Sequence, residues 1–211
     1  MSDGASGARH VAAQDQDDAG RAHLSAADPV IAAVIARVGD DALGHRATRP
    51  SDHWGVLVRA IIAQQVSVAS ADAIFGRLQE FFGGIPTPEQ MFAADPDVMR
   101  SAAGLSRAKT AYLRSLAEHA ATLEDLADLS DEEVRARLTA IKGIGPWTAD
   151  IFLIFHLRRP DVVALGDVGL QRAVANLYGP EATLAEVAER WRPHRTLGCL
   201  YLWRSLDATP A

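Results

Sequence analysis

Apolar residues recur every three or four positions along most of this sequence, which is the spacing of helices with one buried face. One such run follows Asp28-Pro29 and ends at Gly39, and another spans residues 67–82 and stops at Gly83-Gly84. Aspartate or serine caps a helix N-terminus, proline suits the first turn, and glycine ends the last one. The pattern predicts an all-α fold of roughly ten short helices joined by tight turns.

The same start signals place the other helices, which are expected after Asp52, Thr87, Asp95, Ser106, Ser130 and Thr183 and over residues 194–206. The one strand-like stretch, residues 162–165, is short and lies between Pro160 and Gly166. We expect it to be an extended connection between helices.

Residues 1–27 differ from the rest because they are rich in Ala, Gly, Asp and Gln. They lack the basic and apolar regions of a signal peptide, so we expect a disordered acidic tail before one helical domain at 28–211. No apolar stretch approaches the ~18 residues of a membrane span, so no membrane partner is expected.

Composition excludes some chemistry. The single cysteine, Cys199, excludes a disulfide framework and an iron–sulfur cluster held by cysteines. The histidines show no metal-ligand spacing, so neither a catalytic metal nor another cofactor is expected. A net charge of −6 argues against a nucleic-acid partner as a global sum, although DNA binding needs only a local basic face.

The most informative segment is residues 141–150, which read Ile-Lys-Gly-Ile-Gly-Pro-Trp-Thr-Ala-Asp. Gly143 and Gly145 allow left-handed backbone and close approach of another chain, and Ile144 between them can anchor the turn in the core. Pro146 begins a helix whose free N–H groups form an anion site that suits a DNA phosphate. A glycine turn that serves geometry alone is the simpler alternative.

This segment resembles the helix-hairpin-helix motif of DNA repair glycosylases, and the resemblance covers residues 28–206. Residues 61–68, 104–109, 191–195 and 202–203 look like motifs of the 3-methyladenine DNA glycosylase II branch. The resemblance implies two helical lobes with an active-site cleft between them, in the compact form that lacks an N-terminal β-rich domain.

The resemblance assigns the catalytic carboxylate to Asp167, which follows the extended segment about twenty residues after the hairpin. Cleavage of an N-glycosidic bond builds positive charge on the sugar, which a fixed anion stabilises, and the carboxylate can also orient or deprotonate the attacking water. Asp167 also begins a helix, so a role as an N-cap alone is the competing interpretation.

Related enzymes that also nick DNA carry a nucleophilic lysine in the second hairpin helix, where this sequence has Trp147. The resemblance therefore implies a monofunctional glycosylase in which water attacks the sugar. Trp147 and Trp203 would line the base pocket and attract a cationic alkylated purine, although both could be core residues. Ile151 and Val168 stand where the family has pocket tyrosines, so the range of substrates is open.

The extruded base leaves a gap that a side chain must fill. By resemblance Gln65 is the wedge, with Gln64 as its alternative, and hydrogen bonding within the loop is the simpler role for both. Phosphate contacts are expected from Lys142, Gly143, Ile144, Gly145, Arg107, Lys109 and Arg172. A monovalent cation bound by the hairpin backbone at 141–146 would bridge to the phosphate.

The sequence thus predicts a monomer that repairs damaged double-stranded DNA, in the cytoplasm with the nucleoid of a bacterium or in a eukaryotic nucleus. Three alternatives stay open: a glycosylase of this fold with another lesion, a non-catalytic DNA-binding module, and a helical protein-interaction domain. The last would not require the glycine hairpin.

Overall fold

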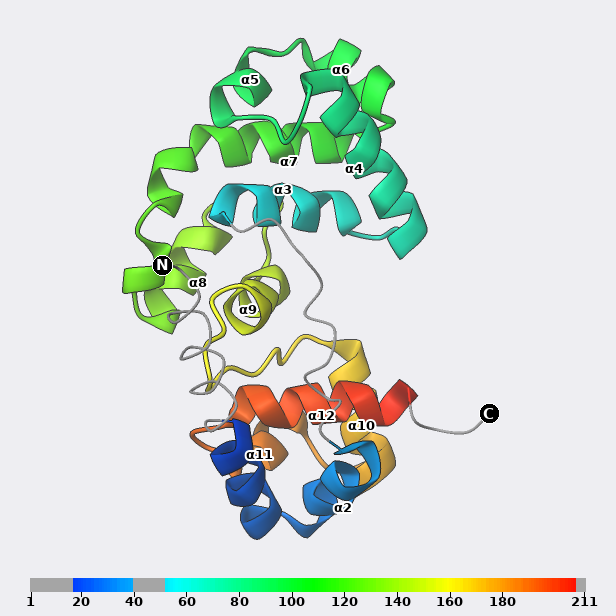
Figure 1. Ribbon diagram of the computed structural model, residues 1–211, viewed down its shortest axis with the longest axis vertical. Coiled ribbons are helices and arrows are strands. Elements are labelled where there is room, and N and C mark those ends of the chain that lie inside the picture. The colour runs from blue at the N-terminus through cyan, green and yellow to red at the C-terminus, as the bar shows by residue number, and fades with distance from the viewer. Residues whose placement is uncertain (1–16, 40–51, 208–211) are drawn as a thin grey trace, which may run out of the picture. The chain divides into compact units, whose positions relative to one another are not determined.

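The computed structural model describes residues 17–39 and 52–207, and every regular element in these ranges is a helix (Figure 1). The all-α prediction is therefore confirmed. The chain divides into two compact units, a central unit (Ala47–Leu157) and a terminal unit (Met1–Arg46 with Arg158–Ala211). None of the described helices has the length and apolar character needed to cross a membrane.

In the central unit, α7 lies between α3 on one side and the α5–α6 pair on the other (Figure 1). The helix α4 packs on α3 and α6, and α8 packs on α9. Large aliphatic side chains from α3 and α7, such as Ile61, Leu113 and Leu116, are fully buried there. The helices are α3 (His53–Ala63), α4 (Val68–Phe82), α5 (Pro88–Ala93), α6 (Pro96–Ala103), α7 (Arg107–Glu118), α8 (Asp131–Thr139) and α9 (Pro146–Phe155), with 3₁₀ turns η2 (Ala120–Leu123) and η3 (Leu126–Asp128).

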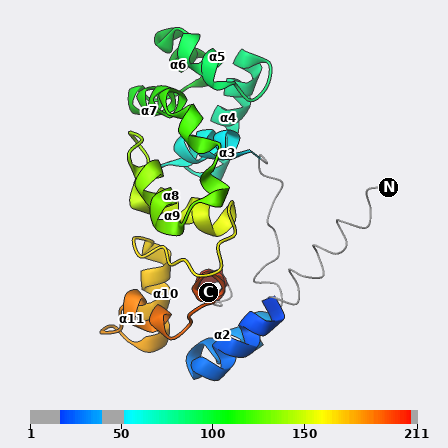
Figure 2. The same ribbon diagram turned by 90° about the vertical axis from the view of Figure 1, so that its left-hand side faces the viewer.

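In the terminal unit, α12 (Arg195–Asp207) is the central helix. Figure 2 views it end on, with α10 (Val168–Tyr178) and α11 (Leu184–Glu189) on one side and α2 (Pro29–Val38) on the other. Chain segments from both ends of the sequence therefore build one core.

The caps that the sequence predicts are present. Asp28 is the fullest example, because its buried carboxylate accepts hydrogen bonds from the backbone N–H groups of Val30 and Ile31. Its second oxygen accepts from the Tyr178 hydroxyl at 2.8 Å and the Trp191 indole at 3.0 Å. One N-cap thus also ties α2 to the segment around α10 and α11.

The prediction of a disordered tail at 1–27 is wrong for residues 17–27, which form a helix. Leu24 is fully buried, and a Cβ on Gly20 would lie 2.8 Å from Leu197 of α12. This helix packs too closely on α12 to count as a tail. Residues 1–16 lie outside the described part.

Candidate active site

The hairpin is formed by α8, the six connecting residues 140–145 and α9. Gly143 has φ +94°, and a Cβ there would lie 2.2 Å from the Tyr112 ring of α7, so only glycine fits. Ile141 and Ile144 are buried, and the Ile144 N–H donates to the Ile141 carbonyl at 3.0 Å. The expected anchoring of the turn by Ile144 is confirmed.

An ion pair braces the two hairpin helices. Arg135 Nε of α8 donates to the Asp150 carboxylate of α9 at 2.7 Å. Burial raises the pKa of the Asp150 carboxyl, and the hydrogen bond and charge of Arg135 oppose that shift. The pair thus joins α8 to α9 beside the turn.

Gly145 caps α9 without any side-chain hydrogen bond, and Pro146 takes the first position. A Cβ on Gly145 would have no neighbour within 4 Å, so the protein itself does not require glycine there. The N-terminus of α9 therefore has no side-chain cap and an open space beside Gly145, which suits an external anion.

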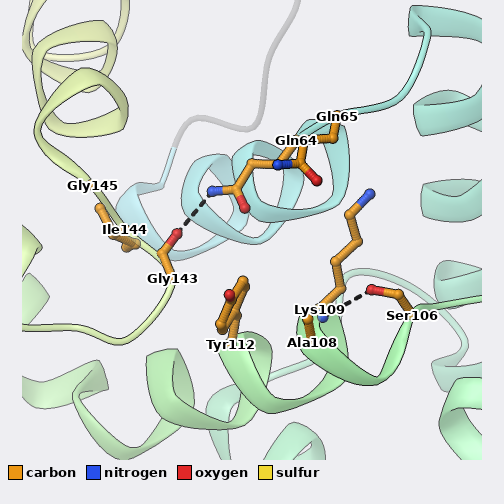
Figure 3. Close-up of a pocket in the computed structure, with 9 residues that line it drawn as sticks. All are labelled: Gln64, Gln65, Ser106, Ala108, Lys109, Tyr112, Gly143, Ile144 and Gly145. Atoms are coloured by element: carbon orange, nitrogen blue, oxygen red, sulfur yellow. Dashed lines mark hydrogen bonds between the residues drawn. The ribbon is translucent and has the colours of Figure 1, made fainter. Parts of the chain in front are cut away.

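Three segments meet beside the hairpin around a cavity of about 390 Å³ (Figure 3). They are the turn after α3, the start of α7 and the glycines of the hairpin. Gln64 Nε2 donates to the Gly143 carbonyl at 2.8 Å, whereas Gln65 is exposed. Of the two wedge candidates, Gln64 is thus engaged with the hairpin and Gln65 is presented outward.

A second cavity, of about 240 Å³, lies between α3 and α9 in the central unit. Trp147 and Ile151, both predicted pocket residues, line it with Gln64 and Gln65. Clefts that hold drug-sized ligands have volumes of roughly 300–1,000 Å³. This cavity is smaller, and its size fits one small ring system. Trp147 is 44% exposed, so its interpretation as a core residue is wrong.

The pocket also has basic walls that the sequence analysis missed. Arg59 and His156 line it; Arg59 pairs with Asp72 at 2.5 Å, and His156 Nε2 is 2.7 Å from His53 Nδ1. The helical spacing of Thr148, Ile151, Phe152 and Phe155 marks the wall that α9 contributes.

Asp167 belongs to the terminal unit, where it caps α10. Its Oδ1 accepts the Leu170 N–H at 2.8 Å and the Trp203 indole N–H at 3.0 Å. Asp167 is partly exposed, and its neighbour Val168 is 75% exposed. The structure thus groups Trp203 and Val168 with Asp167, and Trp147 and Ile151 with the cavity of the central unit.

The segment before Asp167 is fixed to the start of α12. Thr196 Oγ1 accepts the Val162 N–H at 3.0 Å and donates to the Arg159 carbonyl at 2.6 Å. Burial alone would raise the pKa of the Asp161 carboxyl, but hydrogen bonds and charge from Arg195, with the charge of Arg192, lower it. These contacts hold the extended connection that ends at Asp167.

The four cationic side chains among the predicted phosphate contacts fall into two groups. Arg107, Lys142 and Arg172 are exposed. Lys109 is partly buried, and its Nζ donates to the Ile62 carbonyl at 2.7 Å. The first three are available to solvent, whereas Lys109 already has a partner within the protein.

Comparison with known proteins agrees with these features. The family described as "HhH-GPD superfamily base excision DNA repair protein" matches residues 58–193. DNA-3-methyladenine glycosylase 1 of Schizosaccharomyces pombe is 33% identical, over 87% of this chain and 85% of its own length.

Two solved structures are also similar. The S. pombe 3-methyladenine DNA glycosylase Mag1, in complex with abasic DNA, has a TM-score of 0.76 and 31% identity, and the match covers 91% of this chain and 99% of that one. A DNA-3-methyladenine glycosidase from Bacillus halodurans has a TM-score of 0.68 and 35% identity, covering 84% and 89%.

Proposed function

This chain belongs to the HhH-GPD superfamily of base excision DNA repair proteins, and we propose that it removes alkylated bases of the 3-methyladenine type from double-stranded DNA. The similar proteins from S. pombe and B. halodurans carry that activity in their names. The protein would act as a monomer wherever the chromosome lies, in a bacterial cytoplasm or a eukaryotic nucleus.

The observation that carries the proposal is the carboxylate of Asp167. Two donors, the Leu170 N–H and the Trp203 indole, fix its orientation, and it stays partly exposed. A fixed anion next to the sugar stabilises the positive charge that develops as the base departs. The same carboxylate would orient the attacking water.

The pocket beside Trp147 would receive the base. Many alkylated purines carry a positive charge, which the face of an indole attracts and which already weakens the glycosidic bond. In this assignment Gln65 fills the space in the duplex, and the hairpin holds a phosphate through the N-terminus of α9. The cation at 141–146 stays a prediction, and the Ile141 and Gly143 carbonyls there already accept one hydrogen bond each.

We expect no strand cleavage by a Schiff base. The second hairpin helix offers Trp147 in place of an amine, and the lysines of the chain are Lys109 and Lys142. Lys142 precedes the glycines, and Lys109 donates to a backbone carbonyl. Water is then the nucleophile, and the product is an intact abasic site.

The test is excision from duplexes that contain 3-methyladenine, 7-methylguanine, hypoxanthine or 1-methyladenine, with and without alkali. We expect breaks at 3-methyladenine only after alkali, because the abasic product must be cleaved chemically. Breaks without alkali would contradict the water mechanism, and DNA binding without any base release would leave only a binding module.

The variant Asp167→Asn keeps the cap geometry and removes the charge, so we expect DNA binding to persist while the single-turnover rate falls at least 100-fold, as for loss of an electrostatic stabiliser. Glu181→Gln, at an exposed carboxylate of the same unit, is the matched control and should excise normally. Base release by Asp167→Asn at the wild-type rate would overturn the assignment.

A further inference from the structure

The turn that presents Gln65 is held from two sides. Lys109 Nζ of α7 donates to the Ile62 carbonyl in the last turn of α3 at 2.7 Å. The Gln64 amide donates to the Gly143 carbonyl of the hairpin at 2.8 Å. Figure 3 shows the Lys109 side chain extending from α7 towards the Gln64-Gln65 turn, with Gln64 directed at Gly143.

The turn needs such support. Gln65 has φ +57°, a left-handed conformation that is unfavourable for a residue with a Cβ. The bond that closes the end of α3, from the Gln64 N–H to the Ile61 carbonyl, is long at 3.4 Å. A strained conformation persists only where the surroundings impose it, and here the two side-chain bonds do so.

The charge of Lys109 suits this place. The carbonyls at the end of α3 carry the negative end of the helix dipole, and an ammonium group there is favourable. Burial lowers the pKa of Lys109, in keeping with an amine that faces the protein. An ammonium group that is bonded to a carbonyl has fewer N–H donors left for a phosphate.

We propose that Lys109 is a positioning residue that holds the Gln65 wedge in place, in contrast to the phosphate contact that the sequence suggested. The inference rests on the proposed function for the role of Gln65 in the duplex. It predicts that Lys109 affects binding to a duplex with an abasic site, where a base is missing from the stack. It also predicts that the charge of Lys109 contributes nothing to the salt dependence of DNA binding.

The test compares Lys109→Met and Lys109→Arg on an intact duplex and on a duplex with a tetrahydrofuran abasic site, over a series of salt concentrations. Lys109→Met should weaken abasic-site binding about tenfold, the usual effect of losing one hydrogen bond from a charged group. Binding to the intact duplex and the slope of log K against log salt should not change. Lys109→Arg keeps a donor and should restore most of the loss.

Lys142→Met, at the other lysine, is the matched comparison. As an exposed phosphate contact, Lys142 should contribute about 0.9 to the slope of log K against log salt. Its loss should lower the affinity for the intact and the abasic duplex equally. If Lys109→Met also reduced the salt slope and lowered the affinity for both duplexes equally, Lys109 would be a phosphate ligand and the inference would be overturned. A lack of preference for abasic DNA in the wild-type protein would also overturn it, since no wedge would then act.

A second readout needs no DNA. Amide hydrogen exchange at residues 62–68 should accelerate in Lys109→Met and return to the wild-type rate in Lys109→Arg, while exchange in α9 stays unchanged. Unchanged exchange in Lys109→Met would also overturn the inference. Failure of the proposed function would appear differently, as absent base release by a wild-type protein that still prefers abasic DNA.

Discussion

At Asp167 a single carboxylate oxygen accepts both the hydrogen bond that begins α10 and the hydrogen bond from Trp203. The interpretations of Asp167 as a cap and as the catalytic anion are therefore compatible, because capping fixes the orientation that catalysis would use. The absence of a side chain at Gly169 leaves room for this oxygen, because a Cβ there would lie 3.0 Å from it.

The bond from Trp203 yields a prediction. Trp203→Phe keeps an aromatic ring and removes the indole N–H, and a hydrogen bond to a charged group contributes about 1.5–3 kcal/mol. We expect the single-turnover excision rate to fall about tenfold or more, with little change in DNA affinity.

Trp147→Phe is the comparison variant, because it keeps an aromatic face in the pocket of the central unit and leaves the Trp203–Asp167 bond in place. Its rate should fall less than that of Trp203→Phe. Equal losses in the two variants would indicate that both indoles act only as pocket walls.

The sequence identified Trp203 by resemblance and could not reveal its bond to Asp167. The two residues are 36 positions apart, and their contact depends on how α12 packs against α10. Arg59 and His156 were missed for a related reason, because the pocket that they line exists only once α3 and α9 are packed together.

At the scale of elements, the two hairpin glycines should behave differently. Gly143→Ala would place a methyl group 2.2 Å from Tyr112 on a backbone with φ +94°. We expect a loss of at least about 2 kcal/mol in the free energy of unfolding, from the clash and the left-handed conformation together.

Gly145→Ala adds a methyl group where the protein has no neighbour within 4 Å, so we expect thermal stability close to wild type. DNA affinity should fall instead, because the methyl group would stand where a phosphate approaches the N-terminus of α9. Denaturant unfolding and DNA titration of both variants measure this contrast. Wild-type DNA affinity of a folded Gly145→Ala protein would contradict the role of the hairpin.

The caps explain how much of the fold the sequence could predict. Asp28, Ser67 and Ser130 each bond to backbone N–H groups two or three residues away, so the signal and the structure are both local. The helix of residues 17–27 carries no comparable signal. Its one large apolar residue, Leu24, is buried through tertiary contact, which local spacing does not encode.

For the whole molecule, the net charge of −6 and the affinity for DNA need to be reconciled. Many arginines are neutralised by acidic partners, as in the pairs of Arg135 with Asp150 and Arg195 with Asp161. In the part of the chain that the structure describes, no ion pair is formed by Arg107, Lys142 or Arg172. A few unpaired cations can thus supply the local field that the global sum conceals.

This distribution fixes the expected salt dependence of DNA binding. Each phosphate contact contributes about 0.9 to the slope of log K against log salt, so replacing Arg107, Lys142 and Arg172 together by Met should reduce the slope by about 2.7. Arg100→Met removes the same kind of charge from an exposed pair with Asp97 and should leave the slope unchanged. If instead the slope followed net charge alone, Arg100→Met would shift the slope about as much as each of the other replacements. Arg107, Lys142 and Arg172 would then have no special role in DNA binding.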